Sequence, residues 1–346
     1  MSKELELLRA LERFETNITI DAAGVKPTLI EDAVAKNIKI AYYLESVTSS
    51  ISYVGGAKYL LRAQYRNTQV PMRDIFVASS KEQIKSIFCQ YVGNYKKRVV
   101  IFVPNGVNMD AAYKEFMEVQ APFYANLEQI GFQRSETSVC HMPIYDFLFD
   151  YRIGKVKLEM MEIEVDAEVE RIANLLFLPG MPPATKVLLA HNYLACTVQY
   201  YLKKDASDLE KSYMHSAYGA LIRKKCVCQG YAEAFKRLMD FAGIPCEVVC
   251  GQTKGSDDSH AWNLVKLNGE AENYHIDVTW DASGNRLSYD YFGLRDSDFH
   301  GERTWNRSYT PICNSPKNLL LEARRGLLRF QAMLVAKGVD IRFLGH

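Results

Sequence analysis

The sequence predicts an α+β protein of two domains. Three observations carry this: the length, the alternation of strand and helix patterns after residue 70, and a strong break at residues 178–183. A chain of 346 residues is long enough for two domains, since one domain takes roughly 100 to 200 residues. The break, Leu178-Pro-Gly-Met-Pro-Pro183, is rich in prolines, which remove backbone donors, and its glycine favours a turn. We therefore expect a helical N-terminal segment at 1–70, an α+β domain at 71–178 and a second domain at 183–346.

The first domain is predicted from the spacing of its apolar residues. This spacing is every second residue in the expected strands and every three or four residues in the expected helices. The expected elements are a strand at 74–78, a helix at 84–95 capped by Ser80, a strand at 99–103, a helix from Asp110 interrupted at Pro122 and closed by Gly131, paired strands at 144–151 and 156–164 across Gly154, and a helix at 167–176. These residues contain neither G-x-G-x-x-G nor G-x4-G-K-S/T, so the domain has no phosphate-loop motif, and its sequence alone does not indicate a function.

The second domain has clearer signals for where its helices and strands begin and end. A helix at 185–201 is followed by one that begins near Cys228 and ends at Gly243-Ile-Pro245, because glycine and proline terminate helices. Residues 246–251 and 260–267 read as strands, and Asn268-Gly269 is a hairpin signal before the strand that contains Asp277. A last helix, after Pro316, has an apolar stripe that we expect to pack back on the protein.

The composition excludes several classes of protein. The 42 Lys+Arg residues against 41 Asp+Glu leave a net charge of +1, which predicts neither nucleic acid nor membrane as a partner. No apolar run is long enough for a membrane span, and the N-terminus lacks a signal-peptide core, so we expect a cytoplasmic protein with eight reduced cysteines. The cysteine spacings, C-x-C and C-x3-C, do not match zinc motifs, and we expect neither a metal nor an organic cofactor.

Cys228 is the candidate nucleophile. It falls at the first turn of its helix, where unpaired N–H groups and the positive end of the helix dipole favour a thiolate. The same N–H groups can receive the oxyanion of a tetrahedral intermediate. A lone cysteine is more often a small buried residue, so this position needs a second observation.

His260 and Asp277 supply that observation. If the hairpin loop is Asn268-Gly269 alone, the two side chains stand directly opposite each other. If the loop is two residues longer, they move one diagonal apart and stay on the same face. A carboxylate beside an imidazole fixes its tautomer and leaves the other ring nitrogen to accept the thiol proton.

These residues lie in a series of motifs that resembles a known family. The motifs are Val227-Cys228-Gln-Gly-Tyr-Ala, Ala242-Gly-Ile-Pro245, Gly251, His260-Ala-Trp-Asn263 and Tyr274-His-Ile-Asp-Val-Thr-Trp-Asp281. They resemble the transglutaminase-like superfamily, most closely its bacterial members with an α/β region before the core. The resemblance covers roughly residues 183 to 300, and it implies a papain-like core in which the cysteine helix packs on an antiparallel sheet.

The resemblance also implies roles. Cys228 would be the nucleophile, His260 the general base and Asp277 the orienting carboxylate, acting through a thioester on a protein or peptide amide. His275 shares the face of Asp277, but the motif and the cross-strand geometry favour His260 as the base. Cys226, where the family has a small residue, is either an inert neighbour or a thiol that links reversibly under oxidation.

Four further residues are candidates for contact with the substrate. Gln229, Tyr231 and Tyr218 are alternative side-chain donors to the oxyanion, and the sequence does not choose among them. Trp262 either walls the substrate cleft, shields the His260–Asp277 pair from water, or is a core aromatic. The run Arg223-Lys-Lys225 is interpreted as a solvated loop, with attraction of acidic substrates as the alternative.

The expected activity is cysteine-dependent acyl transfer or amide hydrolysis. The alternative is an interaction module that keeps the fold and these residues without turnover. The sequence favours catalysis because all three chemical positions are filled.

Overall fold

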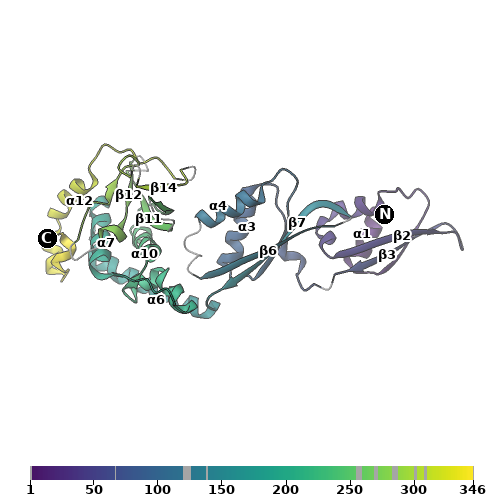
Figure 1. The fold of residues 1–346 in the computed structure, drawn as a ribbon, viewed down its shortest axis with the longest axis horizontal. Helices are drawn as coiled ribbons and strands as arrows, with labels where there is room; N and C mark the ends of the chain where they lie inside the picture. The colour runs from purple at the N-terminus through teal and green to yellow at the C-terminus, as the bar shows by residue number, and fades with distance from the viewer. Residues whose placement is uncertain are drawn as a thin grey trace. The chain divides into compact units, whose positions relative to one another are not determined.

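The computed structural model describes residues 2–66, 68–119, 126–137, 139–254, 259–268, 272–282, 287–299, 302–307 and 310–345. They form two compact units, one of Met1–Phe116 with Gln129–Asp150 and one of Met117–Glu128 with Tyr151–His346 (Figure 1). Within the described residues, none of the helices combines the length and the apolarity that crossing a membrane requires.

The N-terminal unit begins with a small sheet, not with the helical segment expected for residues 1–70. Its elements are α1 (Lys3–Glu12), β1 (Asn17–Asp21), α2 (Leu29–Lys36), η1 (Ile38–Tyr42), β2 (Leu44–Ser52) and β3 (Lys58–Tyr65), with the antiparallel order β1-β3-β2. Ile18 and Ile20 are buried from alternate positions of β1, which is the period of a strand. Gly55 and Gly56, both with positive φ, form the turn between β2 and β3. The helical expectation was wrong because these strands are stabilised by pairing across the sheet.

A second, four-stranded sheet completes this unit. Its strands are β4 (Ile75–Val77), β5 (Arg98–Phe102), β6 (Leu127–Thr137) and β7 (Cys140–Tyr151), in the order β4-β5-β7-β6. The helices of this part of the chain are η2 (Met72–Asp74), α3 (Lys81–Gly93) and α4 (Met109–Val119). The strands expected at 74–78, 99–103 and 144–151 are confirmed, as is the helix capped by Ser80, whose hydroxyl accepts from the Gln83 N–H. Pro122 lies outside the described residues. Gly131 lies inside β6 and does not close a helix.

The largest departure is α6 (Lys155–Leu176), a helix of 22 residues that includes the whole of the strand expected at 156–164. Its buried residues recur at helical spacing, namely Met161, Val165, Val169, Ile172, Ala173 and Leu176. The short alternation after Gly154 belongs to the first turns of this longer pattern. Because α6 packs against α9 and α10, the compact units divide between residues 150 and 151. The proline-rich segment expected as the boundary is a turn inside the C-terminal unit.

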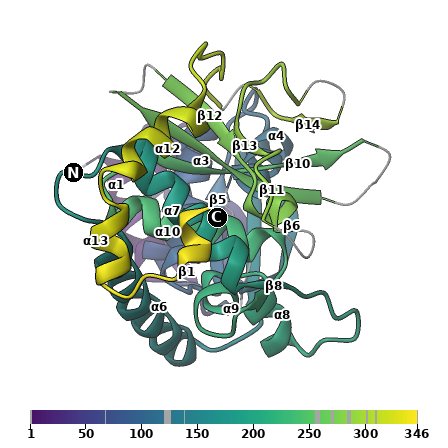
Figure 2. The same cartoon turned by 90° about the vertical axis from the view of Figure 1, so that its left-hand side faces the viewer.

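The C-terminal unit has an antiparallel five-stranded sheet with the order β13-β12-β11-β10-β14. Its strands are β10 (Cys246–Thr253), β11 (Ser259–Leu267), β12 (Glu272–Ile276), β13 (Phe292–Leu294) and β14 (Arg303–Trp305). Helix α10 (Cys228–Phe241) packs on β10 and β11 and also contacts α7 (Pro183–Thr197) (Figure 2). This is the α+β core expected from the sequence, with the cysteine helix against an antiparallel sheet.

Shorter elements surround this core. They are β8 (Gln199–Tyr200), α8 (Asp208–Met214), α9 (Ala217–Leu221), β9 (Lys225–Cys226), α11 (Val278–Asp281), α12 (Leu319–Leu328), α13 (Gln331–Ala336) and η3 (Ile341–Leu344). The helix expected after Pro316 is α12, which buries Leu319, Ala323 and Leu327 and packs against α7. Thr185 of α7 donates a hydrogen bond to the Ala323 carbonyl at 3.1 Å, which fixes α12 on that helix.

Candidate active site

Cys228 is the first residue of α10, as the sequence predicts. Val227 is the N-cap and contributes no side-chain hydrogen bond, so the cysteine lies among the backbone N–H groups of the first turn. The Cys228 side chain is partly exposed. A thiol at this position meets the positive end of the helix dipole and is open to a reagent from solvent.

The first turn of α10 is held by close packing on its inner side. An added Cβ at Gly230 would lie 2.5 Å from the Cβ of Cys226 and 2.9 Å from the carbonyl oxygen of Ser216. Only glycine therefore allows this approach. Cys226 itself is fully buried, and burial raises the pKa of its thiol well above the usual value. These surroundings favour the inert neighbour among the two readings of Cys226.

The hairpin that brings His260 and Asp277 together has the longer of the two predicted loops. Leu267 pairs with Glu272 and Leu264 with His275, so the loop is two residues longer than Asn268-Gly269. His260 lies near the start of β11, while Asp277 follows β12 as the N-cap of α11. The His260 Nε2 is 2.7 Å from Asp277 Oδ2, and Asp277 also accepts the Trp280 N–H at 3.2 Å.

Asn263 ties the histidine strand to the cysteine helix. Its amide nitrogen donates to the Ala232 carbonyl of α10 at 2.9 Å, and the side chain is 1% exposed. Ala232 is one turn after Cys228, and Asn263 is three residues after His260. This bond fixes the helix and the strand that supply the two reacting groups. Asn263 closes the motif His260-Ala-Trp-Asn263, and no role was predicted for it from the sequence.

The electrostatics of the pair favour a charged imidazole. Burial lowers the pKa of His260, but hydrogen bonds and charges from Asp277 and Cys228 outweigh it and raise the pKa to about 9. Burial alone would raise the pKa of Asp277, yet His260 and Arg303 together hold that pKa below its usual range. Because Nε2 faces Asp277, the ring nitrogen left for Cys228 is Nδ1.

Arg303 is a part of the site that sequence reasoning missed. Its guanidinium forms an ion pair with Asp277, and both side chains are fully buried. The guanidinium carbon lies 4.4 Å from the Trp280 ring centre, 4.7 Å from that of Phe299 and 5.1 Å from that of Trp262. Arg303 therefore neutralises Asp277 inside an aromatic enclosure. No local pattern in the sequence marked it, since it reaches Asp277 only through the pairing of β14 with β10.

Trp262 is a core aromatic beneath the histidine. It is 1% exposed, and its indole N–H donates to His275 Nδ1 at 3.0 Å. Its ring stacks on His260 with centroids 5.9 Å apart and an interplanar angle of 20°. This burial removes the cleft-wall interpretation and agrees with Trp262 shielding the ion pair from water.

The structure distinguishes among the three candidate side-chain donors to the oxyanion. The Tyr231 hydroxyl is buried and donates to the Val198 carbonyl at 2.6 Å, so Tyr231 is a core residue. The Tyr218 hydroxyl donates to Glu164 of α6 at 3.1 Å. Gln229 is partly exposed beside Cys228, and its amide donates to Glu233 at 3.1 Å. Gln229 is thus the remaining side-chain candidate.

A second group of cysteine, histidine and aspartate lies nearby but has the opposite electrostatics. His275 Nε2 lies 3.0 Å from Asp296 Oδ1, and Cys313 lies beside the same carboxylate. Burial lowers the pKa of His275, whereas burial and the Asp296 charge raise the pKa of the Cys313 thiol. A neutral imidazole and a protonated thiol do not make a nucleophilic pair. The role of His260 as the base stays a prediction.

The same three side chains are close enough to hold a metal ion, with ligand atoms within 4.8 Å of one another. The indole N–H of Trp262 points at His275 Nδ1, so that nitrogen carries the lone pair and Nε2 carries the proton. A metal-binding histidine instead donates its second nitrogen's proton to an acceptor. The cluster therefore fits a hydrogen-bonded network and not a metal site.

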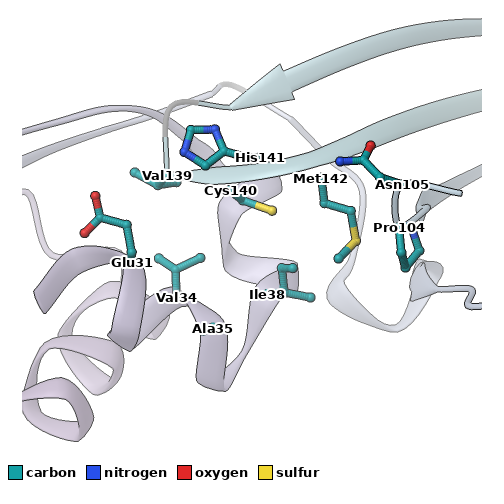
Figure 3. Close-up of a pocket in the computed structure, with 10 residues that line it drawn as sticks. All are labelled: Glu31, Val34, Ala35, Ile38, Pro104, Asn105, Val139, Cys140, His141 and Met142. Carbon is teal, nitrogen blue, oxygen red and sulfur yellow. The ribbon is translucent and has the colours of Figure 1, made fainter. Parts of the chain in front are cut away.

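The N-terminal unit carries a separate pocket of about 310 Å³ (Figure 3). Its lining is mostly apolar, with Val34, Ile38 and Met142 on its walls and Glu31 and His141 as the charged or titratable groups. The thiol in this lining, Cys140, is buried, and burial raises its pKa. The lining therefore lacks an activated nucleophile.

The fold and the site together define a protein with a thiol at a helix N-terminus and a histidine–carboxylate pair on the facing antiparallel sheet. Residues 171–278 match the model of the transglutaminase-like superfamily. This segment of the chain is therefore transglutaminase-like, as the sequence motifs predict.

Two solved structures are similar to the chain at low identity. One, described as a TGase, is 13% identical, with 63% of this chain and 64% of that chain covered and a TM-score of 0.29. The other, a candidate cysteine protease from Cytophaga hutchinsonii, is 12% identical, with 55% of this chain and 81% of that chain covered and a TM-score of 0.29. No curated protein matches the chain. The family assignment rests on the matched segment.

Proposed function

We propose that this protein catalyses cysteine-dependent acyl transfer or amide hydrolysis on a protein or peptide substrate. The observation that carries the proposal is the geometry of the site: Cys228 is the first residue of α10, and His260 Nε2 lies 2.7 Å from Asp277 Oδ2. Asp277 and Cys228 also raise the pKa of His260 to about 9. A thiol beside a protonated imidazole is a nucleophile at neutral pH, whereas an isolated thiol is not.

The first half of the reaction forms a thioester. The Cys228 sulfur attacks the carbonyl carbon of a carboxamide, and the sulfur–carbon bond forms as the carbonyl oxygen becomes an oxyanion. The N–H groups of the first turn of α10 receive that charge. When the carbon–nitrogen bond breaks, the His260 imidazolium gives its proton to the departing nitrogen, which leaves as ammonia or an amine.

The second half releases the acyl group. Water or an amine attacks the thioester carbonyl, and His260, now neutral, takes the proton of the incoming group. The sulfur–carbon bond breaks and Cys228 is regenerated. Asp277 keeps the imidazole oriented throughout, and Arg303 keeps Asp277 ionised in its buried position. None of these steps needs a group from outside the chain other than the substrate and the acceptor.

Selective alkylation tests the nucleophile. At mildly acidic pH, iodoacetamide should label Cys228 faster than the other cysteines, with the labelled positions read by peptide mass spectrometry. Cys89 and Cys196 are the internal controls, because both are partly exposed and burial raises the pKa of both thiols. Labelling of Cys228 at the rate of these two would contradict thiolate activation.

Turnover is tested separately, on a panel of glutamine-containing peptides with and without an added amine. An acyl adduct on Cys228 with loss of ammonia indicates transfer from a glutamine side chain, whereas cleaved peptides indicate a peptidase. The Cys228→Ala variant is the control for both products. Neither an adduct nor a product from wild-type protein whose Cys228 is reactive would favour the silent interaction module.

A further inference from the structure

A small basic pocket lies beside the start of the cysteine helix. Its lining residues are Tyr201, Glu210, Tyr213, Met214, Arg223 and Lys225, and its volume is about 120 Å³. The side chains come from α8, from β9 and from the segments next to β8 and α9. Figure 2 shows α8, α9 and β8 gathered in one part of the C-terminal unit, and α8 contacts both α9 and β9.

The three consecutive cations at 223–225 divide between two sides of the chain. Arg223 and Lys225, two residues apart, both line the pocket. Lys224 adopts a positive φ of 55° and turns to the other side, where its Nζ is 3.4 Å from Glu168 and 3.1 Å from the Tyr193 hydroxyl. Arg223 and Lys225 are exposed, as expected for a solvated loop, and both also line one hollow.

Aromatic rings hold these two charges in place without neutralising them. The guanidinium of Arg223 lies 4.8 Å from the Tyr213 ring centre, and the Lys225 Nζ lies 5.6 Å from that of Tyr201. Across the described ranges, neither cation has a carboxylate within the 4.0 Å of an ion pair. A cation ordered on a ring and lacking a counter-ion is prepared to bind an anion.

Glu210 is the acidic member of the lining, and it has other partners. Its carboxylate is 3.1 Å from the Lys203 Nζ and accepts the Ser207 N–H in the capping box of α8. The pocket thus keeps a net positive charge, but a carboxylate remains in its wall. A monoanionic carboxylate fits these charges better than a phosphate dianion, which Glu210 would repel more strongly.

The pocket is joined directly to the nucleophile. Lys225 is three residues before Cys228, and the Val227 N–H donates to the carbonyl of Met214, a lining residue, at 2.9 Å. Met214 and Val227 also share a small buried cluster. Three residues of extended chain reach about 10 Å at most, so the Cα atoms of Lys225 and Cys228 lie within a distance that a substrate residue about three positions from the reacting one can span.

We propose that Arg223 and Lys225, supported by Tyr213 and Tyr201, form a subsite for the side-chain carboxylate of an Asp or Glu in the substrate peptide, about three residues from the acyl donor. This inference rests on the proposed function and names a substrate class for it. Arginine binds a carboxylate through two parallel hydrogen bonds, which makes the subsite selective for charge and shape.

The test compares two labelled heptapeptides with a central Gln. One carries Asp three residues to either side of the Gln, and the other carries Asn at both positions, with Ala elsewhere. Binding is measured by fluorescence anisotropy with Cys228→Ala protein, so that it does not depend on turnover. We expect the Asp peptide to bind at least tenfold more tightly than the Asn peptide, and the difference to shrink in high salt.

The variants Arg223→Gln and Lys225→Gln, in the same background, should each weaken binding of the Asp peptide and leave the Asn peptide unchanged. Lys224→Gln is the matched control, because it removes one charge from the same run on the side that faces away. Equal affinity for the two peptides, no binding of the Asp peptide, or an equal loss in Lys224→Gln would overturn the subsite.

Turnover by the protein with an intact Cys228 separates this inference from the function on which it rests. Preferential binding without any acyl adduct would leave the subsite standing and remove the catalytic proposal. Acyl transfer at equal kcat/KM from both peptides would leave the catalytic proposal standing and overturn the subsite. If both proposals hold, Arg223→Gln should raise the KM for the Asp peptide, whereas Lys224→Gln should leave that KM unchanged.

Discussion

His260 and Asp277 lie in contact, with Nε2 and Oδ2 2.7 Å apart, although the strands that lead to them are not in direct register at these positions. Asn263 pairs with Ile276, so the position opposite Asp277, if the ladder is extended, is that of Trp262. The aspartate leaves the strand as the N-cap of α11, and this turn lets its carboxylate reach the histidine one diagonal away.

The pH dependence of turnover should report this contact. The folded-state pKa of His260 is raised to about 9 from 6.5, so its protonated form is present below that value and is lost as the pH rises through it. Activity should therefore fall on the alkaline side near pH 9. Asp277→Asn removes the main cause of the raised pKa, and we expect the alkaline limb to move toward about 6.5, the usual pKa of histidine.

The same variant should lower kcat on the order of 10³- to 10⁴-fold, because the imidazole loses its tautomer and its orientation. A pH-rate profile of wild type and Asp277→Asn measures both effects. An unchanged alkaline limb in the variant would show that another group, and not His260, governs that limb.

Arg303 and Asp277 should be energetically coupled. Arg303→Met leaves a carboxylate buried without its guanidinium, and breaking a buried ion pair costs about 3–5 kcal/mol of the free energy of unfolding. The double variant Arg303→Met with Asp277→Asn removes both charges, so its loss should be smaller than the sum of the single losses. Urea denaturation of the four proteins measures this cycle, and strict additivity would mean that the two residues do not interact.

Asn263 should affect the nucleophile through geometry. Asn263→Ala removes the bond to the Ala232 carbonyl and leaves a buried acceptor, at a cost of about 1–3 kcal/mol in stability. The rate of Cys228 alkylation should also fall, since the histidine strand is no longer fixed to the cysteine helix.

Asn273→Ala is the matched control for this experiment. The Asn273 amide also donates to a backbone carbonyl, that of Ile312 at 3.2 Å, but its partner lies outside α10. Its alkylation rate should equal that of wild type. Equal rates in both variants would remove the positioning role of Asn263.

Variants at Gln229 and Tyr231 should have different effects, the first on kcat and the second on the free energy of unfolding. Gln229→Ala should lower kcat on the order of 10²-fold if its amide adds to the oxyanion site of the backbone. Tyr231→Phe loses a buried hydrogen bond to the Val198 carbonyl and should lower the free energy of unfolding by about 1 kcal/mol with kcat unchanged. Wild-type kcat in Gln229→Ala would assign oxyanion binding to the backbone alone.

Most of the candidate site could be predicted from the sequence, because the patterns that mark its helix start and its hairpin each lie within a short segment. Cys228 was expected at a helix start from the apolar spacing after it and from the terminator at Gly243, and α10 begins there. His260 and Asp277 share a face in either even register of one hairpin, so their contact needed only the sheet's period of two. The strands expected at 246–251 and 260–267 are confirmed for the same reason.

What the sequence left open depends on contacts between distant segments. The strands in residues 17–65 need partners across a sheet, and α6 is defined by packing on α9 and α10 more than by its first turns. The same limit applied to side chains, because burial and bonding removed Tyr231 and Trp262 from contact with a substrate.

The sequence by itself determined the α+β class, the cysteine helix and the pairing of a histidine with an aspartate. Only the tertiary structure decided that Arg303 neutralises Asp277, that Asn263 binds the helix to the strand, and that Arg223 and Lys225 converge on one pocket while Lys224 turns away. Periodicity fixes which residues share a face of one element. Which charges meet is decided when separate elements pack and exclude water, because burial then makes each unpaired charge costly.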